Sequence, residues 1–296
     1  MIPGSRRARL GWVDAAVLSA VVVAFGYVFH RVDAVLEYRW DWSAIPNSLY
    51  RWDEETGRWV PNLLMQGFFT TIRLAILSMI PAALFGAVFG VLRTAGRLFP
   101  RLLSRTYVEL IRNIPPLVFI FIFYFFISSQ IMPILGVEDF VRRASPAALR
   151  SLELVFGPAA LIPNVVSGVI CLAMFQGAYM TEIVRAGIQS IPKTQAEAGL
   201  SLGLSRWELW RRVILPQALR RVIPPLAGQF ITLVKDSSIL SLISIQELTF
   251  LAMETAVSTT RVFEVWITVG GLYFCLCALL SLAFNRLEKS AAAARA

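Results

Sequence analysis

The stretch TQAEAGLSLGLSRWELWRRVILPQ, residues 194–217, separates two long apolar segments of the chain. Thr194 and Ser205 each stand three residues before a glutamate, and both therefore match the capping-box pattern that starts a helix. Gly203, just before the second pattern, suits the residue after a helix end, where a positive φ is required. The stretch predicts two short helices joined by a tight turn at 203–205.

The composition assigns the chain to a membrane. Apolar residues make up 57% of the 296 residues, charged residues 16%, and the mean hydropathy is +0.65. These values lie outside the range of soluble domains of this size. The net charge of +9 is therefore interpreted by the positions of the Lys and Arg residues relative to the membrane spans.

Six segments approach or exceed the roughly 20 apolar residues that a membrane-spanning helix needs. They are 13–30, 66–92, 110–131, 159–184, 222–246 and 262–284. The predicted fold is an all-α integral membrane protein with about six transmembrane helices. Its parts are an N-terminal anchor span with an extracytoplasmic loop (1–65), a transmembrane domain (66–285) that contains the connecting loop 193–216, and a tail (286–296).

Short basic patches indicate the orientation of the spans. The two clearest are Arg6, Arg7 and Arg9, and Arg93, Arg97, Arg101 and Arg105. Positive residues in short loops favour the cytoplasmic side, so both termini and the 193–216 loop are predicted to be cytoplasmic. No small-residue cleavage site follows the first apolar run, which favours an uncleaved anchor over a secretory signal peptide.

Residues suited to catalysis or metal binding are scarce. Cys171, Cys275 and Cys277 lie in apolar runs, where a thiol acts as a small hydrophobic group, and His30 is the single histidine. We therefore expect no catalytic residue, no metal site and no cofactor bound by this chain.

The connecting loop has two physical interpretations. Two short helices joined by a turn also occur in DNA-binding proteins, but the flanking spans hold this pair at a membrane, so nucleic acid is not an expected partner. The loop is either an interfacial connector, with Trp207 and Trp210 resting on lipid headgroups, or a docking element for a partner. The physical pattern alone leaves both open.

A resemblance favours docking. Glu197, Ala198 and Gly199, then Gly203, and finally Val213, Leu215 and Pro216 resemble the EAA loop of ATP-binding-cassette (ABC) importer permeases, with matching spacing. Gly199 and Val213 replace an alanine and an isoleucine of that pattern. We expect Gly199 to loosen the first short helix by about 1 kcal/mol.

Three further motifs, in the right order, resemble the polar amino acid branch of these permeases. They are YVELIRNIP from Tyr107, GAYMTEIVRAGIQSIPKTQAEA from Gly177 and FITLVKDSSI from Phe230. The resemblance covers roughly residues 63–285. It implies a bacterial inner-membrane subunit of an amino acid importer.

The resemblance also implies the partners. In the family, the EAA loop forms coupling helices that sit in a cleft of a separate ATPase subunit. The sequence contains no Gly-Lys pair and so no phosphate-binding loop, which places ATP and Mg on that partner chain. The other implied partners are an extracytoplasmic substrate-binding protein, a second permease copy or paralogue, and membrane lipid.

Charged and polar residues within spans are candidates for the substrate pathway, because an intramembrane charge must face protein or a wet cavity. Lys235, Asp236, Ser237 and Ser238 form a polar interruption where a loosened helix would suit a transporter site. A structural ion pair to another span is the alternative interpretation.

Three more polar residues belong to this tentative set. Glu182 and Arg112 are predicted at similar depth with opposite charge, either as a structural pair or as part of a gate. Gln176 is expected to form a hydrogen bond between helices.

Two other functional classes remain. An ion-coupled secondary transporter would carry ion-coordinating carboxylates deep in several spans, whereas this chain offers only Asp236 centrally. A membrane scaffold or receptor would not need the ordered loop. Within the ABC class, a different small polar solute is the alternative substrate.

Overall fold

The computed structural model describes residues 11–35 and 38–293. The chain divides into two units, Met1–Trp42 and Ser43–Ala296. The first unit contains helix α1, Trp12–Val35, on which apolar side chains such as Trp12 and Phe25 are exposed. The basic patch of Arg6, Arg7 and Arg9, on which the predicted orientation of the spans partly rests, lies outside the described residues.

Within the described residues, five helices are long and apolar enough to cross a membrane. They are Leu63–Thr94, Pro116–Leu135, Ala159–Gln189, Arg206–Ile243 and Val262–Ser290. The apolar part of α1, Trp12–Val28, is shorter. The predicted all-helical membrane class is confirmed, while the first of the six predicted segments is only a shorter apolar helix.

The second unit begins with elements that the sequence did not predict. Helix α2 (Ala44–Leu49) leads into a hairpin of β1 (Tyr50–Asp53) and β2 (Arg58–Pro61). Trp52 faces Trp59 across the antiparallel strands, with ring centroids 5.8 Å apart. Cross-strand aromatic pairs of this kind stabilise short hairpins. The tryptophan-rich loop therefore contains a small two-stranded sheet.

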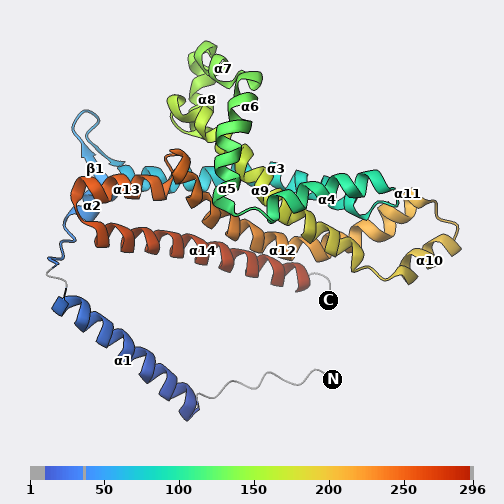
Figure 1. Cartoon of the computed structure of the whole chain (residues 1–296), viewed down its shortest axis with the longest axis horizontal. Helices are drawn as coiled ribbons and strands as arrows, with labels where there is room; N and C mark the ends of the chain where they lie inside the picture. The colour runs from blue at the N-terminus through green and yellow to red at the C-terminus, as the bar shows by residue number, and fades with distance from the viewer. Residues whose placement is uncertain (1–10, 36–37, 294–296) are drawn as a thin grey trace. The chain divides into compact units, whose positions relative to one another are not determined.

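Helices α3 (Leu63–Thr94) and α9 (Ile162–Gln189) lie side by side and form the core (Figure 1). A Cβ on Gly86 would lie 2.5 Å from the Met180 Cβ, and one on Gly90 would lie 2.6 Å from the Val184 Cβ. Small residues let membrane helices approach this closely, which increases their van der Waals contact.

The predicted span 110–131 begins too early. The structure has an amphipathic helix α4 (Leu98–Arg112), then Asn113 to Pro115, and then the span itself: α5 (Pro116–Ile122), a π-helical turn η1 (Phe123–Ser128) and α6 (Ser129–Leu135). The break falls before the Pro115-Pro116 pair because a residue that precedes proline is disfavoured in helical conformation. In Figure 1, α5 and α6 stand at a steep angle to α4.

Shorter helices connect the remaining spans. Helices α7 (Val137–Arg143) and α8 (Pro146–Phe156) follow α6, and the short 3-10 helix η2 (Ala159–Leu161) leads into α9. Helix α12 (Leu215–Asp236) passes into a 3-10 helix η4 (Ser237–Ile243), then α13 (Leu248–Thr259) and α14 (Val262–Ala293). Helix α13 was not predicted, and α14 continues beyond the boundary predicted at residue 285.

Candidate functional site

The connecting segment consists of α10 (Lys193–Ser201), α11 (Arg206–Leu209) and a π-helical stretch η3 (Trp210–Ile214) that runs into α12. Two short helices were predicted here, and two are present. The predicted cap at Thr194 is wrong, because the N-cap is Pro192 and α10 starts at Lys193, two residues earlier than a cap at Thr194 would give. The fixed φ of a proline suits a helix start, so Thr194 lies inside the first turn and cannot cap it.

The second predicted cap is confirmed. The Glu208 N–H donates to the Ser205 hydroxyl at 3.3 Å, and the Ser205 N–H donates to the Glu208 carboxylate at 3.2 Å. Gly203 has the predicted positive φ, 80°. The positive φ of Gly203 and the capping box of Ser205 and Glu208 therefore define the turn between α10 and α11 together.

Gly199 holds the two short helices together. It is buried, and a Cβ there would lie 2.5 Å from the Leu209 Cδ1 of α11. The glycine that departs from the EAA pattern thus permits close packing of α10 on α11. The expected loosening of α10 by the lower helix propensity of glycine stays a prediction.

The outer surface of the connecting segment combines charge with apolar side chains. Glu197 and Ala198 are exposed, Leu202 is 83% exposed, and Trp207 is 68% exposed. Pro216 is exposed at the start of α12, while Leu215 is half-buried. A surface of this kind can bind a protein partner or rest on lipid.

A polar network joins α9 to α12. The Gln176 side-chain amide, which is fully buried, donates to the Asp236 carboxylate at 2.6 Å. The Gln229 amide donates in turn to the Gln176 carbonyl oxygen. Gln176 therefore forms the interhelical hydrogen bond that was predicted, and Gln229 is a member that the sequence analysis missed.

The predicted loosening of the helix at residues 235–238 is present, because α12 ends at Asp236 and η4 begins at Ser237. The Ser237 and Ser238 hydroxyls donate back to the carbonyls of Val234 and Lys235. Among the described residues, neither Lys235 nor Asp236 forms an ion pair, and the Lys235 side chain is exposed.

The predicted pair of Glu182 and Arg112 is wrong. Glu182 pairs instead with Arg93 of α3 and with Arg185 one turn further along α9, each at 2.8 Å. Arg112 lies over the Tyr179 ring, 5.1 Å from its centroid. Arg112 is the last residue of α4 and lies outside the span in which it was predicted. The orientation of α4 places its guanidinium against Tyr179 and not against Glu182.

Glu247 is a buried acid that the sequence analysis missed. Its carboxylate caps α13, because it accepts from the Thr249 and Phe250 N–H groups at 2.9 Å. It also accepts from the Tyr273 hydroxyl at 2.9 Å and from the Thr71 hydroxyl. One side chain thus links α3, α13 and α14. The only sequence signal is an acidic residue before a short apolar helix, since Glu is not among the favoured cap residues.

The fold and these networks define a class: a multi-pass helical membrane protein whose core helix α9 runs from a buried polar network to an exposed pair of short helices. Residues 79–292 match the family described as binding-protein-dependent transport system inner membrane component. The chain belongs to this family of transport components.

Similar proteins agree with this assignment. The chain is 33% identical over 251 residues to the glutamine transport system permease protein GlnP of Escherichia coli K12, covering 85% of this chain and 97% of that protein. It is 31% identical to the glutamate/aspartate import permease protein GltJ of the same organism, covering 76% of this chain and 86% of GltJ.

Solved structures show the same fold. A crystal structure of an amino acid ABC transporter with histidines matches with a TM-score of 0.64 and 27% identity, covering 86% of this chain and all of that chain. The inward-facing methionine ABC transporter MetNI matches with a TM-score of 0.53 and 18% identity, covering 77% of this chain and 95% of that chain, which supports the fold alone.

The Glu247 network predicts a pH dependence of stability. Glu247 lies between the candidate spans, and burial raises the pKa of its carboxyl from the ordinary 4.5 to about 7. Between these two values the folded protein keeps a proton that the unfolded chain has lost, so stability falls as the pH rises through this range. We expect the melting temperature of the detergent-purified protein to fall over this pH window. The fall should be smaller in Glu247→Gln, which does not titrate, and parallel profiles for both proteins would contradict the assignment.

Proposed function

We propose that the chain is the permease subunit of an ATP-driven ABC importer for polar amino acids. The observation that carries the proposal is the family match over residues 79–292 together with the exposed α10–α11 pair at the end of α9. The glutamine and glutamate/aspartate permeases among its relatives support an amino acid as the substrate.

In this proposal the connecting segment, residues 193–216, docks on the ATPase subunit. Glu197 and Ala198 present an exposed surface, and Gly199 and Gly203 give α10 and α11 their close packing and tight turn. Leu215 and Pro216 begin α12, so a movement of the docked pair passes directly into that span. ATP and Mg bind to the partner, and this chain performs no bond chemistry.

Two features support α9 and α12 as walls of the substrate pathway. Gln176 and Asp236 place an amide and a carboxylate between them, and the helix change at Ser237 and Ser238 leaves the Lys235 ammonium exposed. A zwitterionic amino acid needs both a cationic and an anionic partner, and transporter sites commonly use such discontinuous helices.

The other two tentative pathway residues have different roles in this proposal. Arg112 is exposed at the end of α4 and remains available to a substrate carboxylate. Glu182 is neutralised by Arg93 and Arg185, and we assign it to the structural pairing of α9 with α3.

The proposed assembly contains two permease subunits, two ATPase subunits and an extracytoplasmic binding protein, in a bacterial inner membrane with both termini cytoplasmic. Exposed apolar side chains on α3 and α14, such as Ile80, Leu84 and Phe274, support contact with a second permease or with lipid. Binding of ATP and of the loaded binding protein would then favour shared conformations of the assembly.

Substitution Glu197→Arg tests the docking role. Reversing an exposed charge at an interface centre leaves an unpaired or repelled group, so ATPase co-purification and substrate uptake should both fall about tenfold or more. Asp139→Arg on α7 is the matched control, because it makes the same charge change at another exposed position. Uptake and co-purification at the level of the control would refute the docking assignment.

Substitutions Lys235→Ala and Asp236→Asn test the pathway. The asparagine keeps an oxygen for the Gln176 hydrogen bond and removes only the charge. We expect uptake to fall about tenfold in each variant, with unchanged co-purification of the ATPase, because a hydrogen bond to a charged group contributes on the order of 1.5–3 kcal/mol. Normal uptake in both variants would leave these residues with a scaffolding role only.

A further inference from the structure

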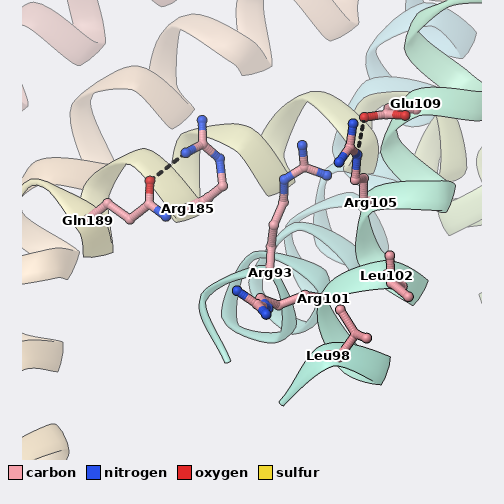
Figure 2. Close-up of a pocket in the computed structure, with 8 residues that line it drawn as sticks. All are labelled: Arg93, Leu98, Arg101, Leu102, Arg105, Glu109, Arg185 and Gln189. Carbon is pink, nitrogen blue, oxygen red and sulfur yellow. Dashed lines mark hydrogen bonds and ion pairs between the residues drawn. The ribbon is translucent and has the colours of Figure 1, made fainter. Parts of the chain in front are cut away.

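A basic pocket lies where the end of α3 and the end of α9 meet α4 (Figure 2). Its volume is about 510 Å³. We call it the arginine pocket and define it by its eight lining residues, Arg93, Arg101, Arg105, Arg185, Glu109, Gln189, Leu98 and Leu102. The Arg185 guanidinium also donates to the Gln189 side-chain oxygen. Three separate helices contribute the four guanidinium groups.

The arginine pocket carries more positive charge than its acidic neighbours neutralise. Arg105 donates to Glu109 at 2.6 Å, and Glu182 is shared by Arg93 and Arg185. Two carboxylates therefore face four arginines. An excess of guanidinium groups from several helices is the arrangement that binds phosphate, because each planar fork can donate two parallel hydrogen bonds.

One buried donor of the pocket has no hydrogen-bond partner. It is the Nη1 of Arg93, whose Nε lies 2.8 Å from the Glu182 Oε1, itself a buried atom without a hydrogen-bond partner. A buried donor without a partner is unfavourable, and more so when it is charged. An anionic ligand in the pocket would supply the missing acceptor.

The walls of the pocket are held in place. The Ser104 hydroxyl of α4 donates to the Phe89 carbonyl of α3 at 2.7 Å, and the Tyr107 hydroxyl donates to the Met174 carbonyl of α9 at 2.7 Å. The rings of Phe89 and Tyr107 stack with centroids 4.4 Å apart. Helix α4 is thus fixed to both neighbours, so the arginines do not have to be gathered when a ligand binds.

One edge of the pocket is apolar. Leu98 and Leu102 of α4 are 63% and 48% exposed, and the neighbouring Phe99 is 75% exposed. A free inorganic anion gains nothing from this surface, whereas the acyl chains of a lipid would cover it. Basic pockets between membrane helices are known to suit anionic headgroups.

We propose that the arginine pocket binds the phosphate headgroup of an anionic phospholipid, with its acyl chains along Leu98 and Leu102. Arg185 lies near the end of α9, and α10 begins at Lys193. The bound headgroup therefore restrains the segment that leads into α10. Its effect on ATPase coupling rests on the function proposed above, whereas the lipid site itself does not.

Native mass spectrometry of the purified chain in equal amounts of phosphatidylglycerol and phosphatidylcholine tests the site. We expect wild type to retain phosphatidylglycerol preferentially, and Arg101→Gln/Arg105→Gln to lose about 25-fold in that preference, since each arginine near an anionic surface contributes about a factor of five. Arg142→Gln/Arg143→Gln on α7 removes the same charge outside the pocket and should behave as wild type.

Wild type retaining the two lipids equally would overturn the proposal without relying on any variant. Equal loss in both double variants would show a general charge effect and would also overturn it. If soluble glycerol phosphate displaces phosphatidylglycerol completely, the pocket binds free phosphate and the lipid assignment is wrong.

The ATPase rate of the assembled transporter in nanodiscs is the second readout. We expect phosphatidylglycerol to raise the wild-type rate, and the Arg101→Gln/Arg105→Gln variant to lose this response. An assembly without ATPase activity in either lipid would count against the importer function, while lipid retention would still decide the pocket.

Discussion

The close approach of α3 and α9 is the contact on which the other interactions of the second unit depend. Glycines at Gly86 and Gly90 bring the α3 backbone against Met180 and Val184, and Gly177 on α9 admits Phe85 and Tyr107. In lipid, apolar burial does not by itself drive helices together, so packing this close has to supply the association. It also positions Arg93 beside Glu182 and the Tyr107 hydroxyl beside the Met174 carbonyl.

Helix α9 joins the three parts of the molecule that bear on function. Its middle carries Gln176, which binds Asp236 of α12, and its end carries Glu182 and Arg185. After Gln189 the chain passes within a few residues into α10. Only residues 190–192 therefore separate the helix that carries the polar network from the proposed docking segment.

The sequence predicted the elements whose signals are local. Apolar length located five of the six predicted spans, although it started one of them too early, and Ser205 and Gly203 defined the turn before α11. The sequence predictions failed where the structure depends on a neighbouring residue or on the position of a distant helix. Pro192 displaced the cap expected at Thr194, and Arg93 took the place expected for Arg112 beside Glu182, because ion pairing depends on how helices are rotated about their axes. Glu247 caps the adjacent α13 and also binds the distant helices α3 and α14, and the sequence carries no signal for these two long-range contacts.

Photo-crosslinking from Leu202 is the most direct test of the claim that the α10–α11 pair docks on an ATPase. Leu202 lies at the turn and is 83% exposed, and Leu154 on α8 is a control with 79% exposure. With a photoreactive amino acid at each position in turn, the account predicts a permease–ATPase adduct from position 202 and none from position 154. An ATPase adduct from position 154 alone, or from neither position in an active transporter, would contradict it.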